Sequence, residues 1–264
     1  MNREAPVIIT HDLVGGNVGG KEAVKPVLYH NGEYIEPLPV YDLRVTDSYL
    51  FELPEPTGSF QIRFLQQDSI PQTFILNGFI PEKNTPGIVY HSIGVNGASV
   101  PSYLECEYFE DELTLINPDL VIFGIGINDA TKRDFSIASF VDDYNQLIQR
   151  IERVNPDCAF VFITNNDSYR RVRRNTYQVN TNGSLAMKAF FEIAQTHQGA
   201  VWDLFSLMGG LRSMQKWEVN KLSKRDKVHF TTAGYELLGD LLYNALIDYY
   251  LQYDNRMKQE NYDN

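Results

Sequence analysis

The strongest constraint on the fold is an apolar run, DLVIFGIG at 119–126, that is followed closely by the polar pair Asn128 and Asp129. A continuous run of this kind is typical of a strand that is buried on both faces of a parallel sheet. Apolar residues at helical spacing come next, with Asp134 as the expected helix cap. These residues are Phe140, Val141, Tyr144, Leu147, Ile148 and Ile151. A buried strand followed by an amphipathic helix predicts an α/β domain.

The same alternation covers residues 85–254, which we predict to form this domain. Parallel strands joined by right-handed helical crossovers are the expected arrangement for such a pattern. We expect residues 255–264 to form a frayed tail. Further strands are predicted at GIVYHSIG (87–94), CAFVFIT (158–164) and AVWDLF (200–205), and helices at about 183–197 and along Leu238, Leu241, Leu242, Ala245, Leu246 and Tyr249.

Residues 1–84 have a different pattern, with short β-rich runs that are interrupted by glycine and proline. Examples are PVIIT (6–10), SYLFELP (48–54) and SFQIRFL (59–65). Strands of this length with frequent turn residues indicate a small antiparallel β-sandwich or jelly-roll module. The sequence therefore predicts a β module followed by an α/β domain.

The chain is acidic, with a formal net charge of −11. This charge argues against nucleic acid as a partner, because binding to phosphates requires a basic surface. We interpret RRVRR at 170–174 as a solvated surface segment. No apolar run is long enough to cross a membrane, and the N-terminal residues do not follow a signal-peptide pattern. Cys106 and Cys158 are expected to be buried free thiols, although a disulfide between them stays open.

Three segments carry candidate chemistry: GVNGAS (94–99), GIND (126–129) and DKVH (226–229). Open α/β sheets place their sites at the carboxyl ends of strands, where the first two segments are predicted. Asp226 can orient the ring of His229, which can then accept a proton from a nucleophile. Each segment also has a simpler interpretation as a turn or a helix cap.

In this order, GVNGAS, GIND and DKVHFTTAGY resemble the second, third and fifth sequence blocks of the SGNH or GDSL hydrolases. The resemblance implies an SGNH-type, flavodoxin-like parallel sheet with flanking helices. It also implies a serine esterase with Asp226 as triad acid, His229 as base, and Gly97 and Asn128 as oxyanion donors. No metal or organic cofactor is implied. The substrate class implied is an ester, and more narrowly an O-acetylated glycan.

The family's first block, Gly-Asp-Ser, is absent from the sequence. Ser48 and Ser69 follow an aspartate, but neither follows a glycine or precedes a predicted helix, so the nucleophile stays unassigned and Ser69 is a doubtful candidate. In members that resemble peptidoglycan O-acetylesterases, a carbohydrate-binding-module-like β domain separates the first two blocks. The chain resembles such a protein truncated after its serine block. This implies an upstream segment or a partner chain that carries the serine, and a periplasmic or extracytoplasmic full-length protein. If Met1 is the true start, a cytoplasmic location is expected.

Other polar and aromatic residues at predicted strand ends are candidate substrate contacts: Asn165, Asn166, Tyr169 and Trp217. Trp217 is equally well interpreted as part of a packed loop. GGNVGGKE (15–22) is not a phosphate-binding loop, because Glu22 replaces the magnesium-binding Ser or Thr and Pro26 interrupts the helix. GIGIND ends in Asp129 where a dinucleotide fingerprint has glycine. The alternatives to hydrolysis are an O-acyltransferase and a non-catalytic carbohydrate-binding module on an inert SGNH-like scaffold.

Overall fold

A computed structural model gives the arrangement of residues 7–12, 24–38, 48–53, 57–66, 76, 78–83, 86–174 and 176–262. These residues divide into two units. The first unit contains residues 1–94 together with 110–116, and the second contains residues 95–109 and 117–264. Among the described residues, no helix combines the length and the apolar character that a bilayer span requires.

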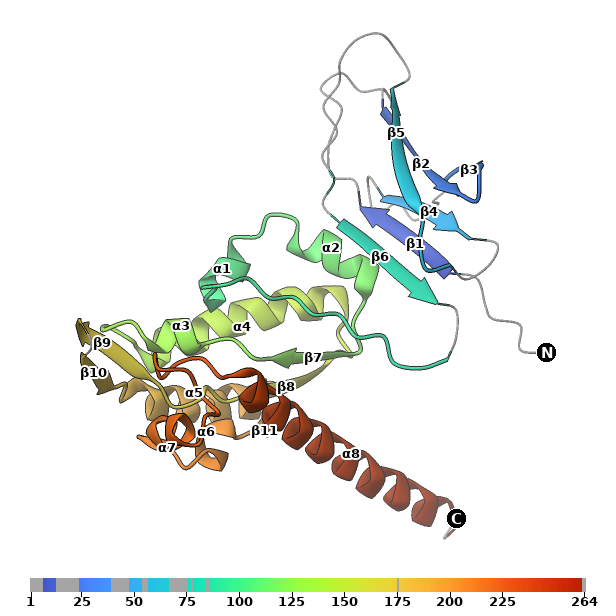
Figure 1. Cartoon of the computed structure of the whole chain (residues 1–264). Coiled ribbons are helices and arrows are strands. Elements are labelled where there is room, and N and C mark those ends of the chain that lie inside the picture. Colours follow the sequence, from blue (N-terminus) through green and yellow to red (C-terminus); the bar gives the residue numbers. More distant parts are fainter. Residues whose placement is uncertain are drawn as a thin grey trace. The chain divides into compact units, whose positions relative to one another are not determined.

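The first unit contains two three-stranded antiparallel sheets, with strand orders β4-β1-β6 and β3-β2-β5 (Figure 1). Leu28 of one sheet packs with Phe51 and Leu53 of the other in a common buried core, so the two sheets face one another as in a sandwich. The antiparallel β module is therefore confirmed. Ser48 begins a strand, whereas Ser69 and the glycine-rich segment 15–22 lie outside the described residues. The strands are β1 (Val7–Asp12), β2 (Val24–His30), β3 (Glu33–Ile35), β4 (Ser48–Glu52), β5 (Gln61–Gln66) and β6 (Gly78–Lys83).

The second unit is built around a parallel sheet of β7 (Leu120–Phe123), β8 (Ala159–Ile163) and β11 (Ala200–Trp202). The strand order is β11-β8-β7, with β8 in the middle. Because all three strands run in the same direction, their carboxyl ends meet at one edge of the sheet. The predicted α/β fold with a parallel sheet is confirmed.

Aromatic side chains fill the space between this sheet and two helices, α4 (Ile137–Val154) and α5 (Asn182–Thr196). The rings of Phe123 and Phe162 stack with centroids 5.2 Å apart, and Tyr144 of α4 meets both of them edge-on. The Tyr144 hydroxyl donates to the carbonyl of Ile125 at 2.8 Å. This partly buried bond fixes the chain where it leaves β7 and enters the candidate site.

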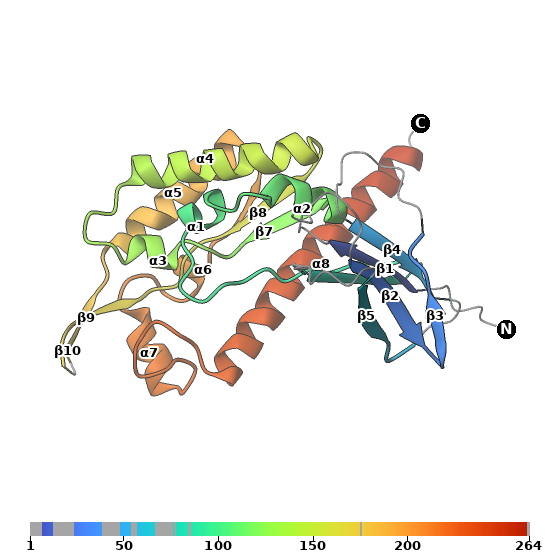
Figure 2. The ribbon, with the colours of Figure 1, turned by 90° about the horizontal axis from the view of Figure 1, so that it is seen from above.

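Shorter elements surround the carboxyl edge of the sheet, and a long helix ends the chain (Figure 2). A β-hairpin of β9 (Tyr169–Arg173) and β10 (Thr176–Val179) follows β8. The other helices of this unit are α1 (Val100–Leu104), α3 (Ile127–Ala130), α6 (Leu204–Leu207), α7 (Ser213–Val219) and α8 (Thr232–Tyr262). One more helix, α2 (Phe109–Ile116), precedes β7, and its residues 110–116 belong to the first unit.

Several local predictions were wrong. The strand predicted at 87–94 is not formed, and Ile88 and Tyr90 are 97% and 81% exposed. A strand needs a partner for its backbone hydrogen bonds, and the local sequence pattern does not show whether a partner is present. Ser136, not Asp134, caps α4, because it directly precedes the first helical residue and its hydroxyl accepts from the Ser139 amide.

The C-terminal segment and one cysteine also differ from expectation. Residues 255–262 continue α8 instead of fraying, because no glycine or proline interrupts them and Lys258 pairs with Asp254 one turn earlier. Cys158 is buried and free as expected, but Cys106 is exposed in the turn after α1.

Candidate active site

The acid–base pair lies in the loop that precedes α8. The Asp226 carboxylate accepts the ring N–H of His229, with Oδ2 and Nδ1 2.9 Å apart. Its other oxygen, Oδ1, accepts the backbone amides of Val228 and His229 at 2.9 and 3.0 Å. With Nδ1 bound in this way, Nε2 is the ring nitrogen left for proton transfer.

The same hydrogen bonds set the charge state of Asp226. Partial burial by itself raises the pKa of its carboxyl, but the bonds from the backbone and ring of His229 and from Val228 outweigh burial, so the pKa lies below the ordinary value. The carboxylate is therefore ionised at neutral pH. An ionised Asp226 can hold the ring and stabilise an imidazolium when His229 takes up a proton.

Bonds to the start of α8 close the acid–base loop. The Thr231 amide donates to the carbonyl of Leu222 at 3.0 Å, and the Thr231 hydroxyl accepts the Gly234 amide at 3.2 Å. A β-carbon on Gly234 would overlap the carbonyl of Leu222, so only glycine permits this approach. The glycine of FTTAGY thus positions the loop that carries His229.

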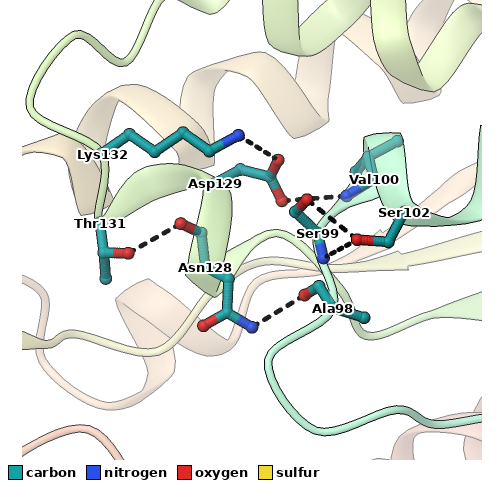
Figure 3. A network of polar contacts seen from close by, with 8 residues as sticks. All are labelled: Ala98, Ser99, Val100, Ser102, Asn128, Asp129, Thr131 and Lys132. Atoms are coloured by element: carbon teal, nitrogen blue, oxygen red, sulfur yellow. Dashed lines mark hydrogen bonds and ion pairs between the residues drawn. The ribbon is translucent and has the colours of Figure 1, made fainter.

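The oxyanion candidates lie in two other loops of the second unit. Gly97 is exposed in a turn, with φ +81°, a conformation that favours glycine. Asn128 belongs to α3, directly after β7, and its Nδ2 donates to the carbonyl of Ala98 at 2.8 Å. This bond joins Asn128 to Ala98, which lies 30 residues earlier in the chain (Figure 3). The second N–H of the Asn128 side chain can donate to another acceptor, such as a substrate oxygen.

Asp129, next to Asn128, makes a second bond between the same two loops. Its side chain is buried, and Oδ2 accepts the backbone amide of Val100 at 3.2 Å, while Lys132 lies 3.7 Å from Oδ1. Burial raises the pKa of this carboxyl, although the Val100 amide and Lys132 oppose the shift. Figure 3 shows Asn128 and Asp129 reaching from one turn to the segment 98–100. The prediction treated Asp129 only as a possible cap.

The segment after β8 supports the acid–base loop from the other side. Asn166 donates through Nδ2 to the carbonyl of Val228 at 3.1 Å, and the Tyr169 amide donates to the carbonyl of Lys227 at 3.1 Å. The predicted site residues Asn166 and Tyr169 thus hold the backbone beside His229. Contact of either residue with substrate stays a prediction.

The residue after Tyr169 reaches the opposite loop. Arg170 donates through Nη2 to the carbonyls of Ala130 and Lys132, both at 3.3 Å. The carboxamides of Asn180 and Asn182 also donate to Ala130, at 3.0 and 3.1 Å. Adjacent residues of β9 therefore connect the GIND loop with the DKVH loop. Neither asparagine was predicted as a site residue, although the Asn-rich stretch QVNTNGS was a signal in the sequence.

Two further candidates are largely enclosed. Asn165 is 6% exposed, and its Nδ2 has no hydrogen-bond partner. Trp217 is half-buried in a cluster of apolar side chains, meets the ring of Phe230 at 5.4 Å, and donates from its indole to the carbonyl of Met208 at 3.3 Å. This placement matches the packed-loop interpretation of Trp217, and a substrate-facing role stays a prediction. Among the described side chains, no three His, Cys, Asp or Glu residues gather as a metal site.

One solved structure shares the fold of the chain, and two others match it over a smaller part. A peptidoglycan O-acetylesterase superposes with a TM-score of 0.64 at 20% identity, over 93% of this chain and 65% of that one. The chain therefore spans just under two thirds of that protein. A lipase/acylhydrolase from Enterococcus faecalis gives a TM-score of 0.42 at 24% identity, over 57% of this chain and 71% of its own. An acetyl xylan esterase gives a TM-score of 0.45 at 18% identity, over 58% of this chain and 78% of its own.

Sequence comparison supplies the family. No curated protein matches the chain. The family model of the GDSL-like Lipase/Acylhydrolase family matches residues 76–237, which is more than half of the chain and includes Gly97, Asn128, Asp226 and His229. The chain belongs to the GDSL-like lipase/acylhydrolase family.

Proposed function

We propose that this protein is a serine-type ester hydrolase that acts on O-acetylated glycan. The observation that carries the proposal is the Asp226–His229 pair, bonded at 2.9 Å and linked through β9 to the loop of Asn128. Membership of an acylhydrolase family supports the reaction class. The glycan substrate is suggested by the fold shared with a peptidoglycan O-acetylesterase.

In the proposed reaction, neutral His229 takes the proton of a serine hydroxyl through Nε2 as the serine oxygen attacks the ester carbonyl. The negative charge that develops on the carbonyl oxygen is met by the Gly97 amide and by the Asn128 carboxamide. Each such donor contributes about 3–4 kcal/mol to transition-state stabilisation. The protonated ring then donates to the leaving alcohol, and water releases the acyl group by the same route.

The serine must come from a segment that the structure does not describe or from another chain. Within the described residues, no serine hydroxyl bonds to the ring of His229, and β7 pairs with β8 alone. Leu120 and Ile122 of β7 are 45% and 36% exposed, although parallel strands are normally covered. We propose that a serine-bearing strand pairs with the free edge of β7, next to the Asn128 loop.

Hydrolysis of p-nitrophenyl acetate tests this proposal. The chain alone is expected to be a poor esterase, and co-expression with an apolar strand ending in Gly-Asp-Ser is expected to restore turnover. The same strand ending in Gly-Asp-Ala is the matched control. Strong activity of the chain alone that disappears in Ser69→Ala would instead assign the nucleophile to Ser69.

Two alternative functions have distinct results in this assay. An O-acyltransferase would move the acetyl group to an added sugar acceptor faster than to water. An inert scaffold would show no turnover with the serine-bearing strand in place. A location outside the cytoplasm is part of the proposal, because the proposed substrate is a cell-wall or extracellular glycan.

A further inference from the structure

The β9–β10 hairpin carries an unusual concentration of positive charge. Arg171, Arg173 and Arg174 are exposed at its outer part, and we call these three residues the basic hairpin. The chain as a whole has a net charge of −11, so these arginines stand against the overall charge of the molecule. The sequence interpretation of RRVRR as a solvated surface does not explain why the charge gathers here.

No carboxylate in the described part of the chain neutralises these three charges. Among the described carboxylates, none lies within ion-pair distance of Arg171, Arg173 or Arg174. The acidic group nearest in the sequence, Asp167, is buried, and its Oδ2 accepts the backbone amide of Met214 at 3.0 Å. Unpaired like charges repel one another, and a bound anion would remove this repulsion.

The basic hairpin is attached to both halves of the candidate active site. The first residue of β9, Tyr169, bonds to the backbone beside His229, and Arg170 bonds to the carbonyl two residues after Asn128. Figures 1 and 2 both show β9 and β10 projecting from the carboxyl edge of the sheet, beyond α3. A polymer that places an ester between Asn128 and His229 can therefore extend along the hairpin.

The chemistry of the charges suits carboxylates. Arg171 and Arg173 lie on β9, where the pairing with β10 shifts register between them, and Arg174 directly follows the strand. A guanidinium binds a carboxylate through two parallel hydrogen bonds, which an ammonium group cannot do. The remaining acidic surface repels any anionic polymer, so binding is expected to depend on these three local cations and on the planar geometry of the guanidinium groups.

We propose that the basic hairpin binds carboxylate groups of an anionic polysaccharide, next to the ester that is cleaved. The proposal rests on the proposed function, because it assigns the substrate an acidic glycan character. It adds a specificity-determining surface outside the residues of the reaction itself.

Binding to defined polymers tests the hairpin without requiring turnover. The probes are polygalacturonate for carboxylates, polyphosphate for phosphates and dextran for a neutral glycan. We expect the full chain to bind polygalacturonate in preference to the other two, and the triple variant Arg171→Gln, Arg173→Gln, Arg174→Gln to bind it about tenfold more weakly. The charge-keeping triple change to lysine is expected to recover only part of the affinity.

A matched control removes three exposed cations elsewhere, with Lys188→Gln, Arg256→Gln and Lys258→Gln. This control is expected to keep the affinity within about twofold, because exposed charges at a distance are screened by salt. Circular dichroism and thermal unfolding establish that each variant is folded. An equal loss in the control, equal binding of polyphosphate, or absence of polygalacturonate binding would each overturn the proposal. Hairpin-dependent binding without any ester hydrolysis would refute the proposed function alone.

Discussion

The acid–base loop is held by hydrogen bonds between residues close in the sequence, whereas the oxyanion loops are held by hydrogen bonds between distant residues. Asp226 and His229 are three residues apart, and the bonds between them are local and partly exposed to solvent. Asn128 meets Ala98 across 30 residues, and the neighbouring bond from Val100 to Asp129 is buried. One half of the candidate site thus depends on a turn, whereas the other depends on the tertiary structure.

The two carboxylates differ in the same way. Hydrogen bonds lower the pKa of Asp226, whereas burial raises the pKa of Asp129. Asp226 is suited to stabilise a protonated His229 ring, and Asp129 is suited to hold the backbone amide of Val100 in a buried position. The comparison predicts that changes in the local half affect the reaction, and that changes in the buried half also affect folding.

The largest effect is expected from the base. In the protein supplied with its serine-bearing strand, His229→Ala should lower kcat by about four orders of magnitude or more, because no other group takes the serine proton. Steady-state hydrolysis of p-nitrophenyl acetate measures the change. His197→Ala is the matched control, because this histidine bonds to Asn145 at the end of α5. A His229→Ala enzyme that retained full kcat would refute the triad assignment.

The second prediction tests whether Asn128 is an oxyanion donor or only a clamp, that is, a residue that holds two loops together through its bond to Ala98. Asn128→Ala should lower kcat by about 100- to 1,000-fold, because it removes one oxyanion donor. Asn155→Ala is the control, since that carboxamide also donates to a backbone carbonyl, that of Pro118 at 3.1 Å, without a proposed role in the reaction. Both variants are expected to lose some stability. If Asn128→Ala loses stability and keeps its kcat, then Asn128 is only a clamp.

Sequence reasoning recovered the local half of the site more completely than the long-range half. The spacing of Asp226 and His229 within one turn is enough to predict their bond. The roles of Asp129 and Asn180 follow from distant backbone groups, the Val100 amide and the Ala130 carbonyl, that no local pattern identifies. The wrong prediction of a strand at 87–94 has the same origin, because a strand is defined by its partner as well as by its own residues.

The third prediction concerns the stability of the acid–base loop. Gly234→Ala should lower the free energy of unfolding by about 1–3 kcal/mol, because its β-carbon would overlap the backbone of Leu222 and the loop would have to move. Gly239→Ala lies in the same helix with open space around it, and should instead stabilise the protein by about 0.5–1 kcal/mol. Urea unfolding of both variants measures the difference. Equal effects would show that the start of α8 is not packed against the loop as described.

The smallest expected effect is a pH dependence of opposite sign at the two aspartates. The folded-state pKa of Asp226 is lowered, so its contribution to stability is present above the unfolded value of about 3.9 and is lost as pH falls through the folded value. The folded-state pKa of Asp129 is raised, so its ionisation opposes folding at neutral pH, and this penalty disappears as pH falls toward about 3.9.

Asparagine variants measure these two contributions, because asparagine keeps an oxygen acceptor and removes the charge. Urea unfolding between pH 7 and pH 3 should show Asp226→Asn less stable than the wild type at pH 7, with the difference shrinking below about pH 4. The stability of Asp129→Asn relative to the wild type should be highest at pH 7, and this advantage should disappear as the pH falls. The Asp226 effect should be small, because exposure to solvent weakens its electrostatic interactions. If both variants followed the same pH course, the contrast between a solvated acid–base loop and a buried oxyanion clamp would be wrong, since hydrogen bonds outweigh burial at Asp226, whereas burial outweighs the Val100 amide and Lys132 at Asp129.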